Sequence, residues 1–452
     1  MSHVFHRSNK ASYPVAVKGD GIYIIDKEGK KYLDGSSGAA VSCLGHSNES
    51  VRQAIKKQVD QLAYAHTSFF TTEPMEQLAD WLVQRAPDGL ERVYFVSGGS
   101  EAVEAAIKLA RQYFLEIGKP EKKYVIARNQ SYHGNTLGAL SAGGNQWRRK
   151  QFEPMLINMS HIAACYEYRG KEEGETSYDY GQRVAGELED KINQLGADNV
   201  VAFIAEPVVG ATIGCVAATE GYFKKIREIC TKYDVLLILD EVMCGMGRTG
   251  KLFACEYDGI TGDIITIAKG LGGGYQPIGA TLVSGKIYNA ITNGTGFFQH
   301  GHTYIGHATA CAASLAVQQV IEKDNLLDNV KKMGKLLESK LRSCFEGHPN
   351  VGDIRGRGLF YGVEFVKDQR TKEALDPSLK LNVKLKANAM QEGLMCYGMG
   401  GTIDGKLGDH VMFAPPFIID EKGINEIIEK FDRAVNKTFD QLGLLSSARL
   451  AG

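Results

Sequence analysis

Two residues with reactive side chains close apolar runs in this sequence. Lys269 ends "IITIAK" and Asp240 ends "VLLILD". Runs that are apolar almost throughout are typical of strands buried on both faces of a parallel sheet. Burial would lower the pKa of the lysine, and a neutral amine is a nucleophile toward carbonyl compounds. The alternatives are ordinary ones: Lys269 could extend its charge to solvent, and Asp240 could form a structural ion pair or cap a helix.

A glycine turn elsewhere in the chain could bind a phosphate. The segment "RVYFVSGGSEAVEAAIKLAR" is typical of a strand, a turn at Ser97–Ser100 and a helix that begins near Glu101. Free backbone N–H groups and the positive end of the helix dipole favour a dianionic phosphate at such a turn. A tight turn with a serine N-cap is the alternative.

A phosphate site, a buried acid and a nucleophilic lysine at neighbouring strand ends together meet the requirements of pyridoxal phosphate (PLP). The PLP aldehyde forms an imine with a lysine, and a carboxylate stabilises the protonated nitrogen of its ring, which then accepts electrons. Ligand sites in open α/β sheets lie at the carboxyl ends of strands. The glycines after Lys269, in "KGLGGG", would let a flat ligand approach the backbone. The combination predicts a PLP enzyme.

Motifs for nucleotides are present but stand in the wrong context. Gly245–Gly250, "GMGRTG", satisfies the dinucleotide pattern G-x-G-x-x-G, but Asp240–Cys244 separate it from the preceding strand. The segment that follows is a poor, short helix. "GMGRTGKL" nearly matches a P-loop, but Leu252 replaces the Ser or Thr that would reach magnesium. A P-loop-like nucleotide-binding protein is therefore a remote alternative.

The histidines and cysteines do not predict a metal site. "HGHTYIGH" contains His300, His302 and His307, but no carboxylate or cysteine nearby completes a zinc ligand set. We expect these histidines to make ordinary hydrogen bonds. The nine cysteines are dispersed without a C-x-x-C pair, which is typical of reduced, buried thiols in a reducing compartment.

The composition excludes several classes of protein. A chain of 452 residues is typical of two packed domains. Lys and Arg number 52 against 53 Asp and Glu, whereas proteins that bind nucleic acid usually carry a basic excess. No apolar run is long enough to span a bilayer, and "MSHVFHRSNKASYP" lacks the apolar centre of a secretory signal. We therefore expect a soluble, cytoplasmic protein that binds neither nucleic acid nor membrane.

The periodicity of the chain places these residues in an α/β fold. Short strands at Ile22–Ile25 and Lys31–Leu33 suggest a hairpin meander before the first helices. From about residue 92, apolar strands alternate with helices, which predicts a mostly parallel sheet covered by helices on both faces. A long helix is expected at about 307–345, and the tail mixes strands with helices as in a smaller α+β domain.

The sequence resembles the class III (ω-amino-acid type) aminotransferases of the fold-type I PLP enzymes over nearly its whole length. The most specific part is "LLILDEVMCGMGRTGKLFACEYDGITGDIITIAKGLGGG", in which the spacing from aspartate to lysine is diagnostic. The resemblance implies a seven-stranded, mostly parallel central sheet between helices, plus a smaller α+β domain. It further implies an N-terminal segment at 1–60 that joins the small domain, a large PLP-binding domain at 61–319 and a small C-terminal domain at 320–452.

The resemblance also implies roles for the reactive residues. Lys269 would form the imine with PLP and then move the proton in the reaction. Asp240 would pair with the ring nitrogen, and Val242 would pack on one face of the ring. Tyr132 in "SYHG" would stack on the other face, although it could instead be a core tyrosine, and His133 follows it in the same cofactor-binding segment.

Further residues complete the implied cofactor site. Gly98, Gly99 and Ser100 would bind the phosphate. Glu206 in "AEPVVG" matches a family glutamate near the cofactor. Thr303 in "GHTYIGH" would reach the phosphate of the neighbouring subunit, which implies a homodimer.

The substrate is less clearly encoded. Several relatives carry an arginine before the segment that here reads "GDHVMFAPP", and it binds a substrate carboxylate; here Cys396–Gly398 occupy that place, and no arginine occurs between 371 and 432. Arg148 and Arg149 in "NQWRRKQF" are candidates because arginine binds carboxylates in a bidentate manner, but a solvated basic turn is an equal alternative. We expect an aminotransferase that moves an amino group from a terminal (ω) amine or ω-amino acid to a keto acid such as pyruvate in a ping-pong cycle. An aminomutase or decarboxylase with the same lysine and aspartate, and a catalytically silent binding protein, are the alternatives.

Overall fold

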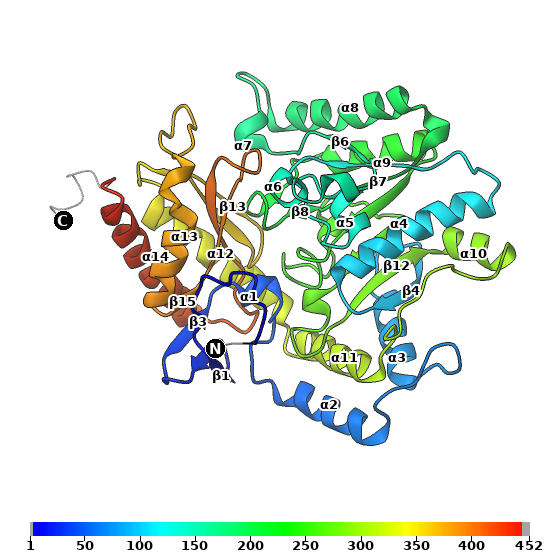
Figure 1. The fold of residues 1–452 in the computed structure, drawn as a ribbon, viewed down its shortest axis with the longest axis horizontal. Coiled ribbons are helices and arrows are strands. Elements are labelled where there is room, and N and C mark those ends of the chain that lie inside the picture. Colours follow the sequence, from blue (N-terminus) through cyan, green and yellow to red (C-terminus); the bar gives the residue numbers. More distant parts are fainter. Residues whose placement is uncertain (1–2, 445–452) are drawn as a thin grey trace.

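A seven-stranded sheet forms the centre of the computed structural model, which describes residues 3–444 (Figure 1). Across the sheet the strands are β4 (Leu90–Val96), β12 (Gly279–Ser284), β11 (Ile264–Ile267), β10 (Leu236–Asp240), β7 (Val200–Ala205), β5 (Tyr124–Arg128) and β6 (Ser160–Ile162). Strand β12 is antiparallel to both of its neighbours, and the other neighbouring pairs are parallel. The predicted mostly parallel, seven-stranded sheet is confirmed.

Helices cover both faces of this sheet because its strands are apolar on both sides. Successive residues of a strand point to opposite faces, and Ile238 of β10 packs with one helical layer while Leu237 and Leu239 pack with the other. The first layer contains α4 (Gly99–Glu116), α5 (Leu137–Ala142) and α10 (Gly285–Asn293). The second layer contains α3 (Glu73–Val83), α8 (Ser177–Leu195), α9 (Tyr222–Lys232) and α11 (Ala308–Lys323).

The register of the central strands brings the predicted reactive residues to one edge. Asp240, the last residue of β10, pairs with Thr266 of β11. Lys269 follows two residues after the end of β11. Strand β4 ends at Val96, directly before the turn that begins α4. The carboxyl ends of these three strands therefore lie together.

Two smaller sheets carry the N-terminal and C-terminal segments. The first has the order β1 (Ala16–Asp20), β2 (Tyr23–Asp26), β3 (Lys31–Asp34) and β15 (Leu394–Met395). The second has the order β13 (Val351–Gly356), β14 (Tyr361–Phe365), β17 (Asp409–Phe413) and β16 (Tyr397–Gly400). Their core contains residues of α12 (Leu326–Phe345), α13 (Leu381–Gln391) and α14 (Glu421–Gln441). Since β3 pairs with β15, the N-terminal segment lies beside the C-terminal part of the chain, as Figure 1 shows.

The expectation of one long helix at about 307–345 is wrong in one respect, because this segment forms two helices. Helix α11 ends at Lys323 and α12 begins at Leu326. Asn325 between them adopts a left-handed conformation with φ of 51°, which interrupts the helix. Asparagine is one of the few residues that tolerate this conformation.

The remaining elements are short or lie beside the large sheet. They are α1 (Ser37–Ala40), α2 (Glu49–Gln61), α6 (Gln146–Arg149), α7 (Glu167–Gly170) and the small hairpin β8 (Val208–Val209) with β9 (Val216–Ala217). None of the helices within residues 3–444 has the length and apolar character needed to cross a membrane.

Candidate active site

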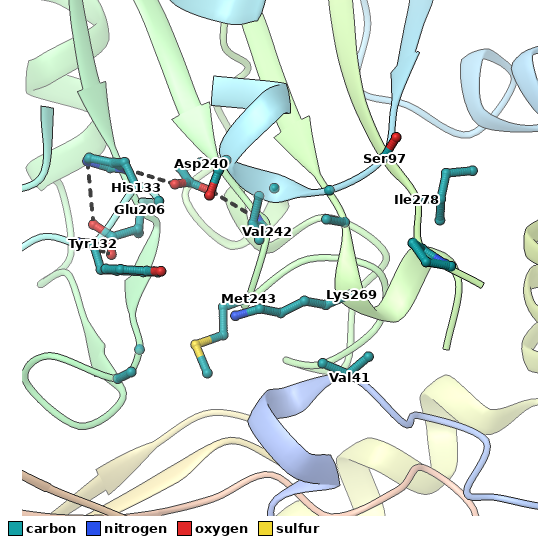
Figure 2. A pocket seen from close by; sticks show the side chains of 18 of the residues that line it. Val41, Ser97, Tyr132, His133, Glu206, Asp240, Val242, Met243, Lys269 and Ile278 are labelled. Atoms are coloured by element: carbon teal, nitrogen blue, oxygen red, sulfur yellow. Dashed lines mark hydrogen bonds and ion pairs between the residues drawn. The ribbon is translucent and has the colours of Figure 1, made fainter. Parts of the chain in front are cut away.

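A cavity of about 260 Å³ lies at the carboxyl ends of the central strands (Figure 2). Nine of the ten residues that the sequence assigned to the cofactor line it: Gly98, Gly99, Ser100, Tyr132, His133, Glu206, Asp240, Val242 and Lys269. They come from five separate regions of the chain, between residues 98 and 269. The fold therefore gathers nearly all of the predicted site.

Lys269 extends its side chain into this cavity, with the amine on the side of Tyr132 (Figure 2). Its backbone has φ of 46°, a left-handed conformation that residues other than glycine rarely adopt. Residues in such conformations are enriched at functional sites. Burial lowers the pKa of the Lys269 amine from 10.5 to about 8, against the opposing effect of the negative charge of Asp240. Near pH 8 a large fraction of this amine is therefore neutral and nucleophilic.

Asp240 has the hydrogen-bonding partner that its burial requires. Its Oδ2 lies 2.7 Å from Nδ1 of His133, and both side chains are buried. Its Oδ1 accepts hydrogen bonds from the backbone N–H of Val242 at 3.0 Å and from the hydroxyl of Thr266 at 3.3 Å. The sequence placed His133 in the site but did not indicate this pairing.

Glu206 is a second buried acid beside the same histidine. Its Oε1 accepts a hydrogen bond from the backbone N–H of Tyr132 at 3.1 Å. Its Oε2 lies 3.9 Å from Nε2 of His133 and 3.8 Å from Nη2 of Arg128. Burial raises the pKa of Glu206. Within residues 3–444, neither Oε2 of Glu206 nor Nε2 of His133 has a hydrogen-bond partner.

The first turn of α4 forms the opposite wall of the cavity. Gly98 is the N-cap of this helix, and the side chain of Glu101 accepts a hydrogen bond from the backbone N–H of Ser97 at 2.8 Å. The first N–H groups of a helix have no partner within the helix, so those of Gly99 and Ser100 are available to a ligand. The hydroxyl of Ser100 accepts the N–H of Asn135 at 3.1 Å and keeps its own proton for donation.

Glycine is required at position 99 because of Val242. A Cβ atom on Gly99 would lie 2.7 Å from Cγ1 of Val242, which is closer than packed carbon atoms approach. Val242 itself lines the cavity. The turn and the predicted ring contact are therefore packed directly against each other.

Most of the glycines after Lys269 are needed for the conformation of the backbone rather than for contact with a ligand. Of the four, Gly274 lines the cavity. A Cβ on Gly272 would lie 2.8 Å from the carbonyl oxygen of Gln276, so this glycine permits a tight turn. Gly273 has φ of 57°. The expectation that the whole run makes space for a flat ligand is thus too broad.

Thr303 lies outside the cavity of its own chain. It is exposed in the loop before α11, and its carbonyl oxygen accepts a hydrogen bond from the hydroxyl of Tyr64 at 2.9 Å. Its predicted contact is with a second subunit and stays a prediction.

The two arginines that the sequence offered for a carboxylate differ in their surroundings. Arg148 lies with its Cζ 4.5 Å from the centre of the Tyr132 ring. Arg149 donates from Nη1 to the backbone carbonyls of Leu140, Ser141 and Gly143.

The glycine-rich segment and the histidines that the sequence singled out contribute to the packing of the fold. In "GMGRTG", Arg248 is buried and donates to the carbonyls of Leu359 and Pro415, so this segment joins β10 to the C-terminal part of the chain. His300 and His302 stack edge to face with ring centres 4.8 Å apart. Residues 3–444 contain no group of three or more His, Cys, Asp or Glu residues that could hold a metal ion.

Some residues of the cavity could not be identified from the sequence. Val41, Met243, Gln276 and Ile278 line the cavity as well. Three of them are apolar, and Val41 comes from the N-terminal segment, far from the other residues in sequence. Side chains of these types are common throughout a core, so neither their type nor their spacing could identify them.

The residues of the cavity fit PLP. The start of α4 offers N–H groups for a phosphate. Asp240 offers a fixed carboxylate for a protonated ring nitrogen, and Lys269 offers an amine for an aldehyde. The unpartnered Nε2 of His133 and Oε2 of Glu206 leave polar atoms on the same wall that a bound polar group could satisfy.

Comparison with known proteins agrees with this chemistry. The sequence profile "Aminotransferase class-III" matches residues 4–435. The chain therefore belongs to the class III aminotransferases, a family of transaminases whose membership implies PLP as cofactor.

Relatives cover almost the whole chain. An uncharacterized aminotransferase of Schizosaccharomyces pombe is 44% identical over 97% of this chain and 95% of its own. A solved (S)-enantioselective omega-transaminase from Thermomicrobium roseum superposes with a TM-score of 0.91 and 35% identity over 97% of each chain. The omega transaminase from Pseudomonas jessenii, solved in complex with PMP, gives a TM-score of 0.92 and 33% identity over 98% of each chain. The predicted fold-type I architecture and the aminotransferase activity are confirmed, and the nucleotide-binding alternative is not favoured.

Proposed function

We propose that this aminotransferase moves the amino group of a terminal (ω) amine or ω-amino acid to a keto acid such as pyruvate in two half-reactions. The observation that carries the proposal is the single cavity into which Lys269, the Asp240–His133 pair and the start of α4 all project. The similarity to solved omega-transaminases supports the choice of a terminal amine.

The cofactor site would be divided among the strand ends. When bound, PLP supplies an aldehyde that forms an imine with amines and a ring that withdraws electrons. Gly98, Gly99 and Ser100 would bind its phosphate through backbone N–H groups and the Ser100 hydroxyl. Tyr132 and Val242 would contact the two faces of the ring.

Asp240 would hold a proton on the ring nitrogen. Its carboxylate is fixed by His133, Val242 and Thr266, so it needs little rearrangement when the ring binds. His133 would keep Asp240 oriented. Glu206 would position Tyr132 through the backbone N–H of that residue.

Lys269 would be the catalytic acid and base. Once an incoming amine has released it, its Nζ would remove a proton from the substrate carbon that carries nitrogen and return it at the next step. A pKa of about 8 suits both directions, because at pH 8 about half of the amine is protonated and half is neutral.

We further propose that the active unit is a homodimer in which Thr303 contacts the phosphate bound by the partner subunit. An exposed aromatic surface supports this: Phe69 and Phe70 are 79% and 67% exposed. Tyr64 joins them to the loop of Thr303, since its ring lies 5.6 Å from that of Tyr304. Exposed aromatic surface of this kind is typical of protein interfaces.

The division of the chain into segments 1–60, 61–319 and 320–452 stays a proposal. The pairing of β3 with β15 supports an N-terminal segment that belongs with the C-terminal part. A cytoplasmic location also stays a proposal, supported by nine free cysteines.

A panel of amines added to the PLP-loaded enzyme tests this function. Amines that serve as donors should remove the visible absorption band of the enzyme, and pyruvate should restore it. If no amine removes the band, the enzyme is not an aminotransferase for terminal amines. An aminomutase would turn over without a keto acid, and a decarboxylase would release carbon dioxide.

A further inference from the structure

The structure separates the two arginines that the sequence could not distinguish. Nη1 of Arg149 donates to the carbonyl oxygens of Leu140, Ser141 and Gly143 at 3.0, 2.6 and 2.7 Å. These contacts hold the backbone that follows α5. A guanidinium engaged in this way has a structural role, so Arg149 is a poor candidate for binding a substrate.

Arg148 differs because its guanidinium has no anionic partner. Among the ion pairs within residues 3–444 none involves Arg148, and its buried Nε has no hydrogen-bond partner. It stacks on the ring of Tyr132, with Cζ 4.5 Å from the ring centre. Stacking uses the face of a guanidinium and leaves its N–H edge free for a carboxylate.

The short helix that carries Arg148 is fixed to the C-terminal part of the chain. The side chain of Asn145 caps α6 by accepting the N–H of Arg148 at 3.3 Å, and its amide donates to Oε1 of Gln130 at 3.0 Å. Gln130 in turn donates to the carbonyls of Gly401 and Thr402 at 2.8 and 3.1 Å. These two residues begin the loop directly after β16.

That C-terminal segment is the place where a carboxylate-binding arginine is missing. Tyr397 of β16 stands there instead and packs in a small cluster with Met243, which lines the cavity. Burial is the main cause of a raised pKa of Tyr132, and the charge of Arg148 opposes it while Tyr397 adds to it. Arg148 and Tyr397 therefore both lie near the hydroxyl of Tyr132.

The charge of Arg148 also reaches the reactive amine. Burial is the main cause of the lowered pKa of Lys269, and the positive charge of Arg148 contributes to it. The negative charges of Asp240 and Glu206 act on the amine in the opposite direction and more strongly. The charge of Arg148 is therefore the feature on this side of the cavity that would attract a carboxylate.

We propose that Arg148 binds the carboxylate of the substrate, and so takes the place of the arginine that this chain lacks before "GDHVMFAPP". The residue stacks on Tyr132, forms no ion pair within the described part of the chain, and is anchored by Asn145 and Gln130 to the segment in question. The substrates it selects are keto acids and ω-amino acids, whereas simple amines do not need it. The inference rests on the proposed function, because it assigns a role within the same site.

The half-reaction with an acceptor tests the proposal. Apoenzyme loaded with pyridoxamine phosphate is mixed with pyruvate or with propanal, which has the same chain length and no carboxylate, and the absorption band of the PLP form is followed. Arg148→Gln should lower the second-order rate constant for the reaction with pyruvate by about 10- to 100-fold. This is the usual effect of losing a charged hydrogen-bonded pair. The rate with propanal should fall much less, because only the contacts of Arg148 with Tyr132 and its effect on Lys269 are lost there. Arg148→Lys keeps the positive charge but not the bidentate geometry. Its rate constant with pyruvate should therefore lie between those of the wild type and Arg148→Gln.

A binding measurement gives a readout independent of turnover. Propionate, which carries a carboxylate but neither an amine nor a carbonyl, should bind the PLP-loaded enzyme by calorimetry and lose affinity in Arg148→Gln by a similar factor. Lys150→Gln is the matched control, because Lys150 is an exposed cation adjacent in sequence and should retain full affinity.

Three results would overturn the proposal. Equal losses with pyruvate and propanal would mean that Arg148 only supports the fold. An unchanged rate with pyruvate would mean that another residue binds the carboxylate. A wild-type enzyme that does not bind propionate would mean that no carboxylate site exists. If the loaded wild-type enzyme reacts with neither acceptor, the proposed function itself fails, which is a different outcome.

Discussion

Nδ1 of His133 lies 2.7 Å from Oδ2 of Asp240, and both side chains are buried at the carboxyl ends of the central strands. The pair explains how an acid can close an apolar strand. An isolated buried carboxylate is costly, whereas this one is hydrogen-bonded by His133, by the backbone N–H of Val242 and by the hydroxyl of Thr266. Asp240 is thereby available to a positively charged ring nitrogen.

Replacing Asp240 should cost far more activity than replacing its partner. Asp240→Asn keeps the size of the side chain but removes the charge, so transaminase turnover should fall by about 100- to 1,000-fold, as for other groups that stabilise developing charge. Turnover of the PLP-saturated variant measures this. Activity close to that of the wild type would show that the ring nitrogen needs no carboxylate here.

His133→Gln should have a smaller effect because it leaves the carboxylate in place. The loss of one hydrogen bond to a charged group predicts a decrease of about 10- to 100-fold in turnover. The pH at which the absorption band of the bound cofactor changes should also shift, since the hydrogen bond that orients Asp240 toward the ring nitrogen is lost. A structural role for His133 alone would lower stability and leave that pH unchanged.

The contact between Gly99 and Val242 predicts a selective loss of cofactor affinity. The methyl group of Gly99→Ala would lie 2.7 Å from Cγ1 of Val242 and displace it toward the ring. The dissociation constant of PLP should rise about tenfold, as expected for overpacking of 1–3 kcal/mol.

The matched control is Gly186→Ala in α8. A Cβ at this position meets nothing within 4 Å, and the position is helical. Its affinity for PLP should equal that of the wild type. If Gly99→Ala bound PLP as tightly as the wild type does, Val242 would not contact the ring.

The lowered pKa of Lys269 predicts how the stability of the apoenzyme depends on pH. The amine has a pKa of about 8 in the folded chain and 10.5 as its ordinary value. Below pH 8 both states are protonated, and the buried charge destabilises the fold. As the pH rises from 8 to 10.5, the folded state has already lost the proton that the unfolded state still holds, so the penalty disappears.

Lys269→Met should therefore raise the melting temperature of the apoenzyme at neutral pH. The gain over the wild type should shrink as the pH rises above 8, and thermal unfolding scans at several pH values measure it. A variant that is less stable than the wild type at neutral pH would contradict the lowered pKa.

The exposed aromatic residues predict that assembly and cofactor binding are coupled. The double substitution Phe69→Asp with Phe70→Asp places charges in the proposed interface and should produce monomers with weaker affinity for PLP, because Thr303 of a second subunit is then absent. Light scattering and PLP titration test both effects. Tyr178→Asp, on an exposed residue of α8, is the control and should leave both unchanged.

The sequence predicted the central sheet and most of the site because strong local signals mark both. Apolar runs identified the strands, and the register of β10 with β11 then brings Asp240 and Lys269 to one edge. The glycine turn before α4 was recognisable from its spacing alone. Features that are determined by neighbouring residues within a single segment could thus be predicted.

Features that depend on contacts between distant segments could not be predicted. His133 and Asp240 are far apart in sequence, so their pairing becomes visible only after folding. Arg148 and Arg149 are adjacent and chemically identical, and only the backbone around α6 decides which of them is free. The break at Asn325 was missed because the apolar periodicity continues on both sides of it.

Reduction with sodium borohydride tests the central claim most directly. The PLP-loaded enzyme is reduced, digested and analysed by mass spectrometry for the lysine that carries the cofactor. The account predicts covalent attachment at Lys269, and no attachment in Lys269→Ala, which can still bind PLP without a covalent bond. Attachment at a different lysine, or none in the wild-type enzyme, would contradict it.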